Sequence, residues 1–344
     1  MIYFQCDYAE GAHPKLIEAL TKTNLEQTIG YGTDHYSESA GKRIREACGS
    51  PEADVHLLVG GTQTNMTVIA SILRPHQGVI SADTGHIACH ETGAIEATGH
   101  KVLALPNQDG TITAEQVAAV AEAHLHCLTA EHEVQPGMVY ISFPTESGTL
   151  YSKQQLTELS GVCRKYGLPL FLDGARLGYG LMSPACDLTL KDISDLCDVF
   201  YIGGTKCGAL FGEAVVINNP QLKRDFRYLI KQRGGMFAKG RILGIQFDEL
   251  FRDNLYFKIC GQAVDYALKI RKAFEDKGIS MFGTSMTNQQ FPILTGKQRE
   301  HFDGKYAYEV WGDLDEEHTI VRFCTSWATT EENIGALLAD IAAM

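Results

Sequence analysis

Apolar segments of strand length alternate with helix-like segments across the middle of the chain. Seven such segments are short, rich in β-branched residues and bounded by turn-forming residues, so we expect them to be strands. The predicted strands are Val55–Val59, Gly78–Ala82, Lys101–Leu105, Met138–Phe143, Leu168–Asp173, Val199–Ile202 and Ala214–Ile217. Strands that alternate with helices favour an α/β fold with a mostly parallel seven-stranded sheet covered on both faces.

Helical spacing of apolar residues predicts the connections between these strands. The predicted helices are Thr62–Leu73, His86–Thr98, Thr113–Leu125, Ser152–Tyr166 and Leu188–Leu196. Two of them begin with a capping box, Thr113-x-x-Gln116 and Ser152-x-x-Gln155, in which side chains at both ends of the first turn bind free backbone N–H groups.

The pattern changes after about Gly240. A long helical stretch, Arg241–Lys277, precedes short strands near Gln290–Leu294 and Thr319–Thr325, and a closing helix follows the capping pattern Thr329-x-x-Glu332. We therefore predict a large α/β domain over residues 1–240 and a smaller α+β domain over residues 241–344. The N-terminal segment, with a helix at Pro14–Lys22, can pack on either domain.

Composition limits the classes of function. The chain has 344 residues and a net charge of −12, which argues against nucleic acid as a partner. It has no apolar run of the ~18–20 residues that a membrane helix needs, and the N-terminus lacks the features of a secretory signal. We expect a cytoplasmic protein, whose ten cysteines, without a C-x-x-C pair, are reduced thiols.

Common nucleotide and hydrolase motifs are absent: the chain has no P-loop, no G-x-S-x-G and no G-x-G-x-x-G after a strand. His86 and His90 stand one helical turn apart with Glu91 beside them, which is compatible with a metal ion. Because no third ligand of suitable type is evident nearby, we predict no metal site.

Three segments at predicted strand ends carry chemically useful groups. Asp173 ends one strand, Lys206 follows another after two glycines, and Gly60-Gly61 lies between a third strand and its helix. Each has an ordinary alternative: a helix cap, a lysine that reaches solvent, and a common turn. The carboxyl ends of parallel strands nevertheless meet at one edge of a sheet, where such folds bind ligands.

Together these residues form the parts of a pyridoxal 5'-phosphate site. Lys206 would form a Schiff base with the cofactor, and Asp173 would keep the pyridine nitrogen protonated. The helix N-terminus after Gly61 would bind the phosphate, with the Thr205 hydroxyl as an additional donor.

The motifs Gly61-Thr62-Gln63-x-Asn65, Asp173-Gly-Ala-Arg176 and the Lys206 turn resemble those of the threonine aldolase and β-eliminating lyase group of fold-type-I pyridoxal-phosphate enzymes. The resemblance extends over nearly the whole chain. It implies a fold-type-I architecture with the same large and small domains. By this resemblance Gly61 and Thr62 bind the cofactor phosphate.

The resemblance also assigns roles outside these motifs. It implies that His86 stacks on the cofactor ring, that Arg176 and Arg322 hold the cofactor or the substrate carboxylate, and that Tyr31 is an active-site tyrosine. Cys6 takes the place of a serine at the substrate site. The group forms dimers or tetramers with sites at the subunit interface, so we expect a homodimer or homotetramer.

The chain departs from the group's pattern at several positions. Glu146 occupies the place of a second active-site histidine that handles the substrate β-hydroxyl, and Thr205 replaces a serine. Phe237 replaces an arginine, so phosphate contacts from a partner subunit would come from other cations. The candidates for these contacts are Lys231, Arg233 and Lys239.

We therefore expect aldol cleavage of a β-hydroxy-α-amino acid of the threonine type into glycine and an aldehyde, with His86 or Glu146 as the base. Because Glu146 is the residue that differs, β-elimination or amino transfer on another amino acid is the alternative. A noncatalytic ligand-binding protein on the same fold is a third hypothesis, since a fold does not fix a function.

Overall fold

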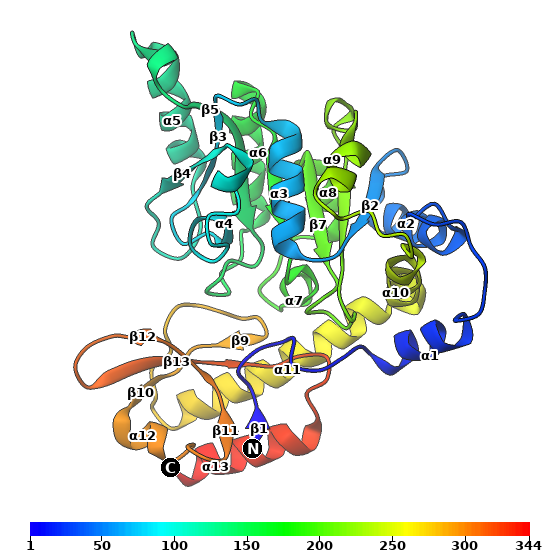
Figure 1. Ribbon diagram of the computed structural model, residues 1–344. Coiled ribbons are helices and arrows are strands. Elements are labelled where there is room, and N and C mark those ends of the chain that lie inside the picture. Colours follow the sequence, from blue (N-terminus) through cyan, green and yellow to red (C-terminus); the bar gives the residue numbers. More distant parts are fainter.

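The computed structural model describes residues 1–344 and contains the expected seven-stranded sheet, shown in the upper half of Figure 1. Its strand order is β2-β8-β7-β6-β5-β3-β4. Five neighbouring strands, β7 to β4 in that order, are parallel, and β8 runs antiparallel to both β7 and β2. The strands are β2 (Asp54–Leu58), β3 (Gln77–Ala82), β4 (Lys101–Leu105), β5 (Gln135–Ser142), β6 (Leu170–Asp173), β7 (Val199–Gly203) and β8 (Glu213–Ile217).

Helices cover both faces of this sheet, as predicted. Alternate residues of β5 point to opposite faces: Met138 and Tyr140 join one apolar core, while Val139 and Ile141 join the other. The smaller core lies under α3 (Gly61–Ile72), α4 (His86–Cys89) and α9 (Phe226–Gln232). The larger core lies under α2 (His35–Cys48), α5 (Ala114–His126), α6 (Lys153–Tyr166), α7 (Leu177–Leu181) and α8 (Leu190–Leu196).

A second, antiparallel sheet lies below the first in Figure 1. Its central strand β13 (His318–Cys324) pairs with β9 (Gln289–Gln290), β10 (Ile293–Thr295) and β12 (Glu309–Asp313). β1 (Ile2–Tyr3) pairs with β11 (Tyr306–Ala307), and Phe4 enters the core beneath this sheet. Residues 2–4 therefore pack with the smaller sheet, whereas Leu16 of the following helix enters the core of the large sheet. Helices α12 (Gly296–Glu300) and α13 (Glu331–Ala343) complete this region.

Two helices connect the sheets, where the sequence predicts one. A kink at Arg252–Asn254 separates α10 (Arg241–Phe251) from α11 (Leu255–Asp276), because Asp253 and Asn254 have positive φ angles. The first half of α11, with α10, packs in the core of the large sheet, and its second half packs in the core of the small sheet. The helix α1 (Pro14–Lys22) packs against α10. The domain division at residue 240 stays a prediction.

Two further predictions about helices are wrong. The predicted helix His86–Thr98 stops at Cys89, because Thr92 and Gly93 take positive φ angles, and only a short turn at Glu96–Thr98 follows. The last helix is capped by Thr330, whose hydroxyl accepts a hydrogen bond from the Asn333 amide, and not by Thr329. The capping boxes at Thr113 and Ser152 are confirmed. None of the helices is long and apolar enough to span a membrane.

Candidate active site

The carboxyl edge of the large sheet collects the predicted chemistry. His86 follows β3, Glu146 follows β5, Asp173 ends β6 and Lys206 follows β7. A cavity of about 250 Å³ lies at this edge, and the small sheet forms its opposite side. Its walls are formed by Tyr8, His86, His90, Glu146, Arg176, Lys206, Glu309, Trp311 and Arg322. Five of the residues that the sequence predicted therefore meet in one cavity.

Lys206 lies on a tight loop after β7. A Cβ atom on Gly203 would lie 2.3 Å from the carbonyl oxygen of Ala175, so the glycine is required by the neighbouring backbone. A Cβ atom on Gly204 would likewise lie 2.7 Å from the carbonyl oxygen of Gly212. The Lys206 amino group makes no hydrogen bond or ion pair within the chain. Burial, followed by the Arg176 charge, lowers the pKa of Lys206, which favours the neutral, nucleophilic amine.

Thr205 closes this loop instead of facing the cavity. Its hydroxyl donates to Oε1 of Glu213 at 2.8 Å and accepts a hydrogen bond from the Gly212 amide at 3.0 Å. The amides of Gly204 and Thr205 both donate to the Gly212 carbonyl. Glu213 is 3% exposed, and burial raises its pKa to about 8. The Thr205 hydroxyl thus donates its hydrogen bond to Glu213 and is not a free donor for a cofactor phosphate.

Asp173 is the most heavily hydrogen-bonded carboxylate of the site. Its Oδ2 accepts from Tyr140 at 2.6 Å and from Asn65 at 3.1 Å. Its Oδ1 accepts from Tyr201 at 2.5 Å and from the Ala175 amide at 3.0 Å. Four donors fix the plane of this buried carboxylate.

His86 is connected to Asp173 through the side chains of Glu91 and Asn65. Its Nδ1 lies 3.1 Å from Oε1 of the buried Glu91, and Asn65 donates from one Nδ2 to both Glu91 and Asp173. Burial disfavours the imidazolium, but the Glu91 hydrogen bond and the Asp173 charge outweigh it and raise the pKa of His86. No three His, Cys, Asp or Glu side chains are grouped as a metal site.

Glu146 is anchored at one carboxylate oxygen only. Its Oε1 accepts from the Ser142 hydroxyl at 2.7 Å and from the His86 amide at 2.9 Å. Its Oε2 is buried without a hydrogen-bond partner. Burial raises the pKa of Glu146, so this carboxyl can hold a proton closer to neutral pH than an exposed glutamate can.

The two arginines of the cavity are both paired with carboxylates. Arg176 forms a two-point contact with Asp7, with Nε–Oδ2 and Nη2–Oδ1 distances of 2.7 and 3.0 Å. Asp7 is fully buried and also accepts from Asn288 at 3.0 Å. Arg322 pairs with Glu309 and donates to the Gln289 side chain and the Gln5 carbonyl.

Helix α3 presents a free N-terminus at the same edge. Its cap residue, Gly60, supplies no side-chain hydrogen bond to the first turn. A Cβ atom on Gly61 would lie 3.1 Å from the Tyr201 hydroxyl, so the first turn passes close to the residue that binds Asp173. The first backbone N–H groups of this helix, around Gly61 and Thr62, form a suitable site for a phosphate.

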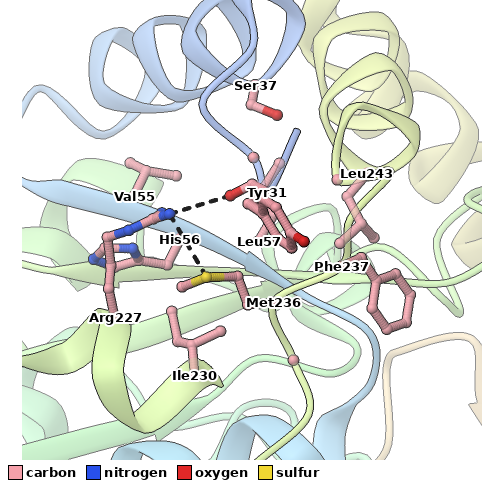
Figure 2. Close-up of a pocket in the computed structure, with 13 residues that line it drawn as sticks. Tyr31, Ser37, Val55, His56, Leu57, Arg227, Ile230, Met236, Phe237 and Leu243 are labelled. Carbon is pink, nitrogen blue, oxygen red and sulfur yellow. Dashed lines mark hydrogen bonds between the residues drawn. The ribbon is translucent and has the colours of Figure 1, made fainter. Parts of the chain in front are cut away.

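Tyr31 and Cys6 are also predicted site residues that do not line this cavity, as are Asp173, Gly61, Thr62 and Thr205 described above. Tyr31 lines a separate pocket of about 60 Å³ with His56, Arg227 and Met236 (Figure 2). Its carbonyl accepts from Arg227, and the Lys231 ammonium lies 4.9 Å from the centre of its ring. Cys6 is partly buried next to Asp7 and does not line the cavity. Within one chain, Tyr31 therefore lies in a different pocket from Lys206.

Comparison with known proteins agrees with this geometry. A sequence profile for beta-eliminating lyases matches residues 5–309. The chain belongs to the beta-eliminating lyase family. It is 27% identical to the low specificity L-threonine aldolase of Pseudomonas sp., over 99% of this chain and 97% of that protein. The corresponding protein of Pseudomonas aeruginosa is 26% identical, over 98% and 96%.

Solved structures place this beta-eliminating lyase family member within a larger fold group. The threonine aldolase of Leishmania major superposes with a TM-score of 0.96 and 43% identity, over 100% of this chain and 99% of that one. Cystalysin from Treponema denticola, which contains pyridoxal 5'-phosphate, superposes with a TM-score of 0.72 and 16% identity, over 100% and 90%. The second likeness supports the fold, which is that of fold-type-I pyridoxal-phosphate enzymes.

Sequence reasoning missed several residues of this family member's site. Tyr140 and Tyr201, which fix Asp173, stand in predicted strands, and their alternation with core residues could have indicated the shared face. Asp7 stands in an N-terminal stretch that also contains Gln5 and Glu10, so no local pattern marks it as a site residue. Glu309 and Trp311 gave no signal, because their five-residue strand β12 mixes charged and apolar residues without regular alternation and was not predicted.

Proposed function

We propose that this protein is a pyridoxal-phosphate-dependent threonine aldolase, which cleaves β-hydroxy-α-amino acids into glycine and an aldehyde. The observation that carries the proposal is that Lys206, Asp173 and His86 meet at one sheet edge, beside two arginines, in a chain 43% identical to a threonine aldolase. β-Elimination and amino transfer use the same cofactor, so the choice among them depends on how the substrate's β-hydroxyl is handled.

The residues fit the cofactor. The Lys206 amine is free of partners and has a lowered pKa, as a covalent attachment point requires. Asp173 offers a fixed carboxylate to a pyridinium nitrogen, and the free N–H groups of α3 suit its phosphate. When bound, pyridoxal phosphate supplies an electron sink for the bond that breaks at the substrate's α-carbon. The residues of the chain then have to bind, orient and deprotonate the substrate.

Arg322 is proposed to bind the substrate α-carboxylate, because a guanidinium matches a carboxylate with two parallel hydrogen bonds. Glu146 is proposed to remove the proton of the β-hydroxyl. Its free Oε2 and raised pKa suit proton transfer near neutral pH. His86 is held by Glu91 through Nδ1, so it is better placed to orient the bound ring than to move freely.

The subunit arrangement is part of the proposal. Tyr31 is 49% exposed, and it lies beside Lys231, Arg227 and Phe237 on one surface of the molecule. An active site that includes Tyr31 would need this surface to face the Lys206 cavity of another subunit. We therefore propose a homodimer or homotetramer with sites between subunits. A monomer with full activity in sedimentation and dilution assays would contradict it.

The assay for the function is aldehyde release from L-threonine, L-allo-threonine and phenylserine by purified enzyme. The Lys206→Ala variant should lose both the cofactor's visible absorbance band and all turnover. Absence of aldehyde from every β-hydroxy amino acid would refute the aldolase. Pyruvate from serine or cysteine derivatives would instead favour β-elimination, and a requirement for a 2-oxo acid would favour amino transfer. An absorbance band without any turnover would indicate a binding protein.

A further inference from the structure

The carboxylate of Glu309 lies where a substrate carboxylate would bind. Glu309 and Arg322 are directly opposite each other on the paired strands β12 and β13, and their side chains form an ion pair at the wall of the Lys206 cavity. No other carboxylate contacts the Arg322 guanidinium. We propose that Glu309 is an internal substitute for the substrate α-carboxylate, which the substrate must displace from Arg322. This inference rests on the proposed function.

Only one of the two arginines can exchange its partner. Asp7 is fully buried, holds Arg176 at two points and is itself held by Asn288, so it has no space in which to move away. The Glu309 side chain is 39% exposed and lies on the edge strand of the small sheet. A carboxylate entering the cavity can therefore replace Glu309, but it cannot replace Asp7.

Arg322 keeps its position when Glu309 leaves. Its Nη1 donates to Oε1 of Gln289 at 2.8 Å, and its Nη2 donates to the Gln5 carbonyl at 3.1 Å. The guanidinium carbon also lies 5.3 Å from the centre of the Trp311 ring, a cation–π contact. These uncharged partners orient the guanidinium, and its Nε remains without a hydrogen-bond partner. Among the partners of Arg322, a substrate carboxylate would thus replace only the Glu309 carboxylate.

The strand geometry permits this movement. The pairing of β12 with β13 changes register between Val310 and Gly312, and this bulge makes Trp311 the unpaired residue. A bulge on an edge strand redirects the side chains around it and weakens the local ladder. Glu309 can therefore turn toward solvent while Trp311 stays against Arg322. Two carboxylates sharing one guanidinium would repel each other, so the displaced side chain must turn away.

If Glu309 competes with the substrate for Arg322, its carboxylate raises KM and leaves kcat unchanged. The Glu309→Gln variant of the cofactor-loaded enzyme should show a KM for L-threonine that is lower by about two- to fivefold, the range expected of a partly exposed ion pair. Its kcat should be unchanged, because Glu309 is absent from the bound state. Glu309→Ala, which also removes the hydrogen-bond acceptor, should lower KM at least as much. Asp313→Asn, on the same strand but outside the cavity walls, is the control and should change neither constant.

A second measurement does not depend on turnover. Binding of 3-hydroxybutyrate, which has a carboxylate but no amino group, should tighten by the same factor in Glu309→Gln when measured by calorimetry. An equal or weaker affinity for 3-hydroxybutyrate in both Glu309 variants would overturn the proposal, as would an equal or higher KM. If no β-hydroxy amino acid is cleaved, the proposed function fails, whereas the calorimetric comparison still decides the role of Glu309.

Discussion

Replacing Asp7 by asparagine is expected to lower the free energy of unfolding by about 3 kcal/mol. Asp7 is fully buried and the Arg176 side chain is 14% exposed, so the substitution leaves a guanidinium in a region that water reaches poorly. Removing one partner of a buried ion pair costs ~3–5 kcal/mol. The lower end applies because asparagine keeps a carbonyl oxygen that accepts one of the two Arg176 hydrogen bonds.

The measurement is urea unfolding at saturating cofactor, followed by fluorescence and circular dichroism. Asp276→Asn is the matched control, because Asp276 and Lys272 form a pair whose side chains are 62% and 75% exposed. That control should cost much less than Asp7→Asn, because solvent screens an exposed pair. Arg176→Met in the Asp7→Asn background removes the unpaired charge, so the double variant should be less destabilised than the sum of the two single variants.

The pH dependence provides an independent check. Burial alone would raise the pKa of Asp7, but Arg176 and Lys206 lower it below its usual value. The stabilisation is therefore complete above the unfolded pKa and is lost as the pH falls through the folded pKa. The difference between wild type and Asp7→Asn should be largest at neutral pH and shrink in acid. Additive variant energies, or a cost no greater than that of Asp276→Asn, would refute the reasoning.

Three further outcomes are expected. Glu213→Gln should remove a loss of stability that runs from the unfolded glutamate pKa of 4.5 up to about pH 8. Burial raises the pKa of Glu213 to about 8, so its stabilisation is complete below the unfolded pKa and falls, by at most ~1.4 kcal/mol per pH unit, as the pH rises through this window. Equal stability–pH curves for variant and wild type would contradict this. Glu146→Gln should lower kcat for L-threonine by at least ~100-fold in a coupled aldehyde assay; a kcat near that of wild type would return the role of base to His86. Thr330→Ala should lower the free energy of unfolding by ~1 kcal/mol through loss of the cap of α13, whereas Glu332→Ala should change it by less than ~0.5 kcal/mol. A larger loss for Glu332→Ala than for Thr330→Ala in denaturant titrations would instead favour the cap at Thr329 that the sequence predicted.

The large sheet was predictable because its strands are nearly continuous apolar runs, which parallel strands buried on both faces require. Helix α2 was missed because its residues are mostly polar, although Asp34, which accepts from the Tyr36 and Ser37 amides, gives a capping signal. The kink before α11 depends on Asp253 and Asn254, residue types that tolerate positive φ, but periodicity alone does not reveal such a break.

The site was predictable where it follows from strand ends. Lys206, Asp173, His86 and Glu146 were found because parallel strands bring their carboxyl ends to one edge. The pairs that complete the site join residues remote in sequence, as in Arg176 with Asp7. No local pattern links such residues, and only the packing of the small sheet against the large one brings them together.

The closed loop that carries Lys206 has a consequence for motion. The amides of Gly204 and Thr205 at its start donate to the carbonyl of Gly212 at its end, and the Thr205 hydroxyl accepts from the Gly212 amide. The backbone of residues 204–212 should therefore stay still while the long lysine side chain swings between its attached and free positions. In amide hydrogen exchange, the tied N–H groups should be among the slowest outside the regular strands. Within this loop, movement during each reaction cycle is thus confined to the four methylene groups of the Lys206 side chain.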